Sequence, residues 1–305
     1  MSTDAISDTM VTYRYVRVGL VALVVFLLTS LALTWAHTCP QGSISAFFYT
    51  RTHAVFLASL CAIGICLIAY KGSRVGEDAL LNYSGFMAFI VALVPTGSDD
   101  LCRPWLPTVS DPFGGVANNV AALFVAVAVG TGMYLALDRW RRPQRAPVPS
   151  APSCAEAATL WKTVATALLR VEKWLPTALL IIAIAGAPLM LWDWFAEHAH
   201  VIAAVAMFLA ITLVAVYHAC YARAAVRRHL ARFYATIAAL MLVTVVAGIV
   251  LLVLGWHFGV IATELTLIVL FAVFWAVQTW DVWDAQDRYP EEAVPTLANT
   301  PTQPV

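Results

Sequence analysis

Eight stretches of mostly apolar residues constrain this chain more than any other feature of its sequence. A helix that crosses the ~30 Å hydrocarbon core of a bilayer needs about 20 such residues. The stretches are continuously apolar rather than alternating, and lipid tolerates no unpaired backbone group, so helices are expected rather than strands. We predict an all-α membrane protein with spans at 16–36, 53–71, 78–96, 117–138, 175–195, 199–221, 233–255 and 262–282.

The composition agrees with this fold class. Hydrophobic residues make up 61% of the 305 residues and charged residues only 12%, whereas soluble domains carry about 25% charged residues. Basic and acidic residues number 18 each, so a net charge of zero offers no attraction to nucleic acid. The expected partner is the lipid bilayer, and the expected location is the cell membrane, with several passes.

The basic residues predict the orientation, because lysine and arginine collect on the cytoplasmic side. Sixteen of them fall on one side of the predicted topology, and only Arg51 and Arg103 fall on the other. An odd number of spans would scramble this asymmetry, so both termini are expected in the cytoplasm. The sixteen are Arg14, Arg17, Lys71, Arg74, Arg139, Arg141, Arg142, Arg145, Lys162, Arg170, Lys173, Arg223, Arg227, Arg228, Arg232 and Arg288.

A proline- and arginine-rich segment divides the spans four and four. Residues 1–140 form the first half, 141–174 a cytoplasmic linker that ends in an interfacial helix, and 175–284 the second half. The polar, proline-rich tail 285–305 is expected to be disordered and cytoplasmic.

The two halves share spacings that indicate an internal repeat. His53 and Tyr70 are seventeen residues apart in the second span, as are His200 and Tyr217 in the sixth. Aligning the fourth span with the eighth places Asn119 opposite Glu264. The halves would then be parallel repeats. The alternative is that apolar helices of similar composition align readily without any repeat.

Ionisable side chains are absent from the central turns of the predicted spans, which argues against a proton relay or a voltage sensor. They gather instead at the outer ends, where five of the seven histidines lie. Histidine with carboxylate is the composition of a divalent-metal site. The candidate ligands are His53, Asn119, Glu197, His198, His200 and Glu264.

Glu197 and His200 have the i, i+3 spacing that places both on one helix face. Such a site could activate water near the lipid headgroups. The alternative is that polar residues simply collect where a helix end meets water. Asn119 could equally cap its helix.

Two further groups stand out. Glu77, Asp78 and Asn82 form an inner-face polar cluster that could bind a headgroup or a partner, or could simply solvate a short loop. Cys39 and Cys102 fall in the two long outer loops of the first half, so they either form a disulfide there or remain free thiols.

Four short runs of the sequence resemble a known group of proteins: Lys71–Ser73, Gly76–Asn82, Val91–Thr96 and Ala276–Trp280. With the starts of the fourth and sixth spans, they resemble uncharacterised multispanning membrane proteins of high-GC Gram-positive (actinobacterial) bacteria. That group has no assigned activity, so the resemblance implies no catalytic residues. The chain resembles intramembrane metal hydrolases of the alkaline ceramidase type far more weakly, because its span centres lack their histidines and aspartate.

Three classes of function follow. The first is a non-enzymatic module that binds or helps to move a small molecule or lipid. The second is a metal-dependent hydrolase or transferase at the outer interface, which would act through Glu197, His200 and Glu264. The third is a membrane scaffold or accessory subunit. No phosphate-binding loop, nucleotide fingerprint or CxxC motif is present.

Overall fold

The computed structural model describes residues 3–37, 39, 41–94, 96, 123–125, 128, 132, 159–190, 192–225, 227–256, 258–281 and 283. Within these residues every regular element is a helix, so the all-α prediction is confirmed. The elements are α1 Thr3–His37, η1 Ser45–Tyr49, α2 His53–Ala69, α3 Val75–Leu93, α5 Thr159–Glu172, α6 Leu175–Leu189, α7 Asp193–Ala224, α8 Arg228–Val253 and α9 Gly259–Asp281.

Seven of the eight predicted ranges overlap one of these helices. The range 117–138 lies mostly outside the described residues, although residues 123–125 in it are helical. Among the described residues, four helical segments are long and apolar enough to cross a membrane: Val11–His37, Asp193–Arg223, Arg228–Val253 and Gly259–Asp281. Helices α2 and α6 are shorter apolar helices.

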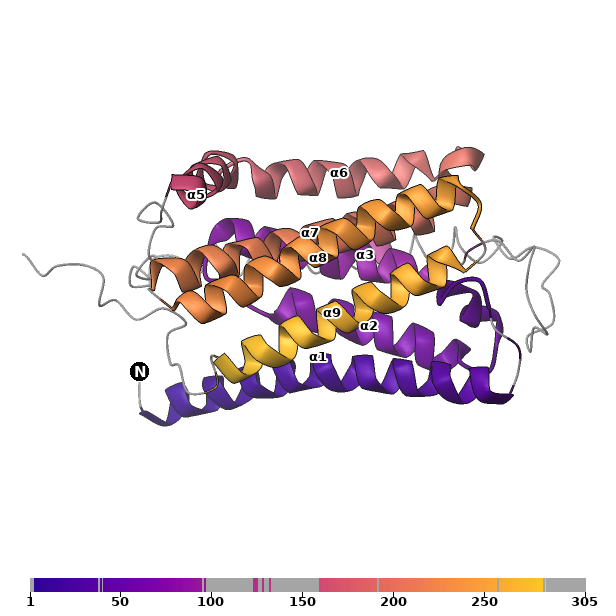
Figure 1. Ribbon diagram of the computed structural model, residues 1–305, viewed down its shortest axis with the longest axis horizontal. Helices are drawn as coiled ribbons and strands as arrows, with labels where there is room; N and C mark the ends of the chain where they lie inside the picture. Colours follow the sequence, from indigo (N-terminus) through magenta and orange to yellow (C-terminus); the bar gives the residue numbers. More distant parts are fainter. Residues whose placement is uncertain are drawn as a thin grey trace, which may run out of the picture.

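The long helices run side by side along one axis (Figure 1). We call the end with the α2–α3 and α7–α8 loops the inner end, at the left of Figure 1, and the end with η1 and the α8–α9 turn the outer end. Helix α7 is the central helix of the bundle. In its most apolar stretch 56% of the residues are buried, against 22–28% in the corresponding stretches of the other three candidate spans. It packs against both α3 and α8.

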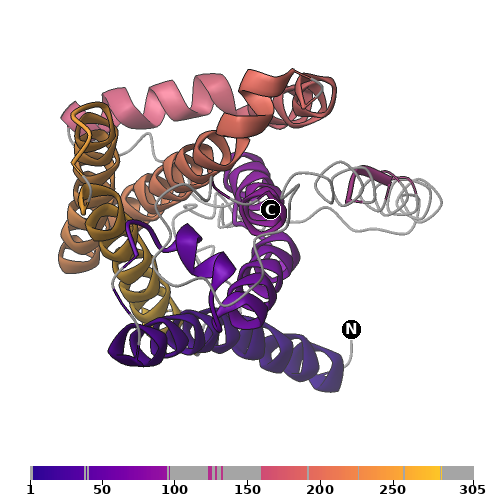
Figure 2. The same ribbon diagram turned by 90° about the vertical axis from the view of Figure 1, so that its right-hand side faces the viewer.

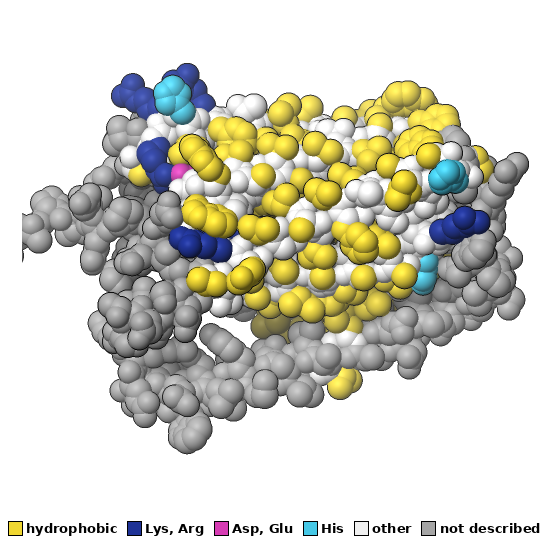
Figure 3. Space-filling model, turned by 90° about the horizontal axis from the view of Figure 1, so that it is seen from below, with side chains coloured by type: hydrophobic (Ala, Val, Ile, Leu, Met, Phe, Trp, Pro, Cys, Tyr) yellow, Lys and Arg dark blue, Asp and Glu magenta, His cyan; other side chains and the backbone are white. Residues whose placement is uncertain are grey.

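Seen from the outer end, η1 lies among the ends of the long helices and covers that end of the bundle (Figure 2). The side face in Figure 3 is hydrophobic along its middle, with Lys, Arg and His side chains near the two ends. That distribution is the one expected for a surface surrounded by lipid.

Helix α5 differs from the others in direction, since it lies across the bundle axis near the inner end (Figures 1 and 2). Its last residue, Glu172, is buried and accepts two hydrogen bonds from the Arg74 guanidinium, from Nε at 3.0 Å and from Nη2 at 2.8 Å. Glu172 also accepts the backbone N–H of Gly76 at 3.3 Å. One carboxylate therefore fastens α5 to the start of α3.

Glycines allow one close helix crossing and one sharp turn in the bundle. Helices α2 and α3 cross at Gly64 and Gly85, where a Cβ added to Gly85 would lie 2.5 Å from the Gly64 carbonyl oxygen. Gly255 has φ +68°, which lets the chain turn sharply after α8. Its N–H donates to the Leu252 carbonyl, and the Trp256 N–H donates to the Leu251 carbonyl, so these two carbonyls in the last turn of α8 are satisfied.

Candidate functional site

Three side chains from distant parts of the sequence meet at the outer end, and we call them the outer cluster: Ser45 of η1, His200 of α7 and Glu264 of α9. His200 Nε2 lies 2.6 Å from Ser45 Oγ, which lies 3.4 Å from Glu264 Oε1. Glu264 Oε2 accepts the Ile44 N–H at 2.6 Å, and His200 Nδ1 donates to the Val94 carbonyl at 2.6 Å. The cluster therefore ties η1 to two helices of the second half.

The hydrogen atoms of the outer cluster can be arranged in two ways. A carbonyl oxygen only accepts, so His200 Nδ1 carries a hydrogen. In the neutral imidazole, Nε2 then accepts the Ser45 hydroxyl; in the imidazolium, Nε2 donates to Ser45, and Ser45 donates to Glu264. The two arrangements use the same heavy-atom contacts and differ by one proton.

A hydroxyl beside an oriented imidazole is also the arrangement of an activated nucleophile. Here Ser45 is only 4% exposed, and it belongs to the short helix that closes the outer end. Neighbouring residues therefore enclose its side chain almost completely in this conformation. The geometry is that of a closed contact between elements.

Of the five outer candidates that the structure describes, it brings together His200 and Glu264. His53 Nδ1 donates to Phe48 O at 2.7 Å. His198 is exposed and stacks on the Trp194 ring at 4.5 Å, and Glu197 is exposed while His200 is buried. Asn119 lies outside the described residues.

A metal site needs at least three converging ligands. Among the residues that the structure describes, no group of three or more His, Cys, Asp or Glu side chains could hold a metal ion. In the outer cluster, the position between the imidazole and the carboxylate is taken by Ser45, which hydrogen-bonds both.

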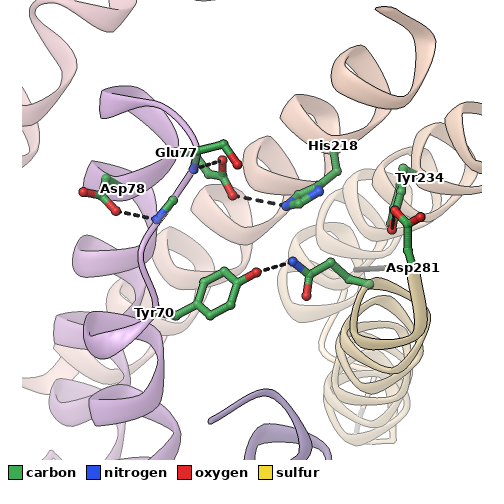
Figure 4. A network of polar contacts seen from close by, with 9 residues as sticks. Tyr70, Glu77, Asp78, His218, Tyr234 and Asp281 are labelled. Atoms are coloured by element: carbon green, nitrogen blue, oxygen red, sulfur yellow. Dashed lines mark hydrogen bonds and ion pairs between the residues drawn. The ribbon is translucent and has the colours of Figure 1, made fainter. Parts of the chain in front are cut away.

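A second buried group, the inner cluster, consists of Tyr70, Glu77, His218 and Gln278 (Figure 4). Their side chains come from α3, α7, α9 and the residue after α2, and all four are at most 1% exposed. His218 Nε2 lies 3.2 Å from Glu77 Oε1, and the Ser73 N–H donates to Glu77 Oε2 at 2.8 Å. Gln278 Nε2 donates to the Tyr70 hydroxyl.

Aromatic rings surround the inner cluster. The Tyr70 ring meets the Trp275 ring edge-on at 4.9 Å, and the Arg17 guanidinium lies 5.5 Å from the Tyr70 ring centroid. Within the described part of the chain, His218 Nδ1 and Gln278 Oε1 are buried without a hydrogen-bond partner. Buried polar atoms are nearly always paired. These two atoms are therefore available to a water molecule or to a rearranged partner.

The three residues predicted as an inner-face cluster have separate environments. Glu77 is fully buried, while Asp78 accepts the Gly72 N–H at 2.6 Å and pairs with Lys71 in the α2–α3 loop. Asn82 is exposed. Only Asp78 fits the expected solvation of a short loop.

An apolar slot lies between the two clusters. It is lined by residues of α1, α2, α7 and α9, has a volume of about 30 Å³, and holds little more than one water molecule. Its α7 residues, Met207, Phe208 and Ile211, lie midway between His200 and His218. The other lining residues are Val24, Leu27, Leu60, Ile63, Leu67, Ile268 and Phe271.

Sequence reasoning did not assign Ser45, Tyr70, Gln278 or His218 to a site. His218 carried the clearest signal, as a histidine that follows the mostly apolar run 201–217 of the predicted sixth span. Ser45 is one of two serines, with Ser43, between the first two predicted spans, and nothing local to it indicates burial.

Cys39 is disulfide-bonded, whereas Cys61, Cys66 and Cys220 are free thiols. Its predicted partner, Cys102, lies outside the described residues, so that pairing stays a prediction.

Comparisons of the chain with protein-family models, curated proteins and solved structures find no match. The function must therefore be inferred from the clusters and the slot themselves.

Proposed function

We propose that the chain is an eight-span protein of the cell membrane with both termini in the cytoplasm, and that it binds and helps to move a small, uncharged molecule without catalysing a reaction. In this proposal the outer and inner clusters are gates at the two ends of one path. The observation that carries it is the placing of two buried histidines on α7, eighteen residues apart, with the apolar slot between them.

The dimensions suit a membrane path. Eighteen residues of helix span about 27 Å, close to the ~30 Å thickness of the hydrocarbon core. Each histidine joins α7 to other elements through hydrogen bonds: His200 to η1 and the end of α3, and His218 to Glu77 near the start of α3. These buried hydrogen bonds can open at modest net cost only where water or the cargo replaces the lost partner, since an unsatisfied buried group is costly. Packed helices switch between discrete arrangements rather than deforming gradually.

The lining of the slot supports an uncharged cargo. All ten lining residues are apolar, so a charged molecule there would find no compensating group. The slot lies between α1 and α2 of the first half and α7 and α9 of the second, which is where a two-half bundle would open. The resemblance to multispanning actinobacterial membrane proteins is compatible with this role.

Cysteine accessibility tests the gates. The test uses Ile211→Cys, in the slot, in a chain whose Cys61, Cys66, Cys154 and Cys220 are replaced by alanine. A small membrane-impermeant methanethiosulfonate reagent is applied separately to right-side-out and inside-out vesicles. The thiol should react slowly from both sides while the gates are closed.

Gate variants should change this reactivity from one side only. We expect Glu264→Gln to raise labelling several-fold from outside, and Glu77→Gln to raise it from inside. Glu197→Gln and Asp78→Asn are matched controls, since these carboxylates lie at the same ends but outside the buried contacts, and they should leave labelling unchanged. Labelling that is unchanged in both gate variants, or that rises equally from both sides, would contradict the proposal.

Metal analysis separates this proposal from the hydrolase class. Stoichiometric zinc, iron or manganese in the purified protein, lost in His200→Ala, would favour a metal-dependent enzyme instead. A slot that stays closed in every gate variant would favour the scaffold class.

A further inference from the structure

An open groove lies where the last turn of α7 meets the first turns of α8, at the inner end. It has a volume of about 260 Å³ and is lined by Arg223 of α7 and by five residues of α8. The α8 residues are Ala231, Arg232, Ala235, Thr236 and Ala239. This groove is separate from both clusters and from the apolar slot.

The two arginines make the mouth of the groove positive. Arg223 is partly buried, and Arg232 is exposed. Within the part of the chain that the structure describes, neither forms an ion pair with a carboxylate, whereas the neighbouring Arg227 pairs with Asp281. Two uncompensated guanidinium groups facing one groove favour an anion, and guanidinium geometry matches phosphate oxygens in particular.

The floor of the groove is apolar. Ala231, Ala235 and Ala239 follow each other at i+4 spacing, so they share one helix face. From Arg232 to Ala239 the helix rises about 10 Å, which carries the groove from the interface into the hydrocarbon region. Beyond Ala239 the exposed surface continues with Leu240 and Val243. A free anion would gain nothing from this floor, whereas an acyl chain would.

We infer that this groove binds an anionic phospholipid of the inner leaflet. Arg223 and Arg232 hold the phosphate, Thr236 offers its hydroxyl to the ester region, and one acyl chain lies along Ala235 and Ala239. Basic pockets between helix ends on the cytoplasmic side are typical sites for such headgroups. The site depends on membrane insertion with this end inward, but not on the gating proposed above.

Native mass spectrometry of the full chain in mild detergent tests the site. The protein is titrated with phosphatidylglycerol, or with phosphatidylcholine of the same acyl chains. We expect selective retention of phosphatidylglycerol. The double variant Arg223→Gln/Arg232→Gln should lower its affinity by at least about tenfold.

Two variants separate the groove from general surface charge. Arg228→Gln removes an exposed arginine from the same helix that does not line the groove, and it should change the affinity less than about twofold. Ala239→Phe fills the floor but keeps both arginines, and it should weaken binding of the lipid. Both positions are exposed, so thermal unfolding should be unchanged, which confirms that each variant is folded.

The remaining outcomes would overturn the inference. Equal losses of affinity for phosphatidylglycerol in the double variant and in Arg228→Gln would mean that this lipid binds through surface charge alone. Displacement of the lipid by millimolar inorganic phosphate, together with normal binding in Ala239→Phe, would identify a soluble phosphate site instead. Equal retention of phosphatidylcholine would exclude an anion site.

Discussion

Glu77 and Asp78 are neighbours in the sequence with opposite environments. Glu77 is fully buried and is hydrogen-bonded to His218 and to the Ser73 N–H. Asp78 is partly exposed and pairs with Lys71, whose side chain is 66% exposed. Removing one partner of a buried pair leaves the other uncompensated, which costs far more than losing a solvated ion pair.

We therefore expect Glu77→Ala to destabilise the protein by about 3 kcal/mol, and Asp78→Ala by about 1 kcal/mol or less. Glu77→Gln should be milder than Glu77→Ala, because its amide can still hydrogen-bond. Chemical unfolding in mild detergent, followed by tryptophan fluorescence, measures these differences. Equal losses of unfolding free energy in Glu77→Ala and Asp78→Ala would contradict the environments assigned to these two residues.

At the scale of single elements, glycine governs how closely α2 approaches α3. A Cβ on Gly85 would lie 2.5 Å from the Gly64 carbonyl oxygen, and a Cβ on Gly64 would lie 2.8 Å from the Gly85 carbonyl oxygen. Both obstacles are backbone atoms, so the helices must separate to admit a methyl group. Small residues at such crossings are typical of membrane helices.

Gly85→Ala should lower stability by about 1–3 kcal/mol, the usual cost of overpacking. Gly186→Ala is the matched control, because nothing lies within 4 Å of a Cβ at that position in α6. It should be neutral or slightly stabilising, since alanine favours helix over glycine. The thermal midpoint of each variant in detergent measures the effect, and similar midpoints for the two variants would argue against the close crossing.

One carboxylate supplies a polar attachment for helix α5. Glu172 accepts hydrogen bonds from the Arg74 guanidinium and the Gly76 N–H, while Val164 and Leu168 of α5 pack against the hydrophobic core. We expect Arg74→Gln to raise the rate of backbone hydrogen exchange in α5 without affecting α7. Lys71→Gln, which removes the neighbouring loop pair, is the control and should leave α5 unchanged. Protection of α5 that persists in Arg74→Gln would show that lipid, rather than this contact, holds the helix.

At the scale of the whole molecule, the charge asymmetry predicts which end faces the cytoplasm. Exposed positions are available at both ends: Arg51 and Trp256 at the outer end, Val75 and Arg228 at the inner end. In the cysteine-depleted chain, Arg51→Cys and Trp256→Cys should react with an impermeant maleimide on intact cells. Val75→Cys and Arg228→Cys should react only after permeabilisation. The reverse pattern would invert the topology and would place the arginine groove in the outer leaflet.

The apolar helices were predictable as helices because hydrophobicity is a local property. A run of about 20 apolar residues identifies a span without reference to the rest of the chain. The candidate site was predictable only in part. The sequence proposed six outer candidates, of which His53, Glu197 and His198 do not join His200 and Glu264. Ser45 between those two was not expected, because its burial depends on η1 folding back over the bundle.

The sequence by itself determined the all-helical class, the apolar segments and a polarised charge distribution with empty span centres. These follow from transfer free energies of side chains, which add along the chain regardless of packing. Only the tertiary structure decided which polar residues are paired inside. Glu77 and His218 are 141 residues apart, and Ser45 and Glu264 are 219 apart. Such pairs arise from the order in which helices pack around α7, and helical periodicity within one segment carries no information about a neighbour so distant in the chain.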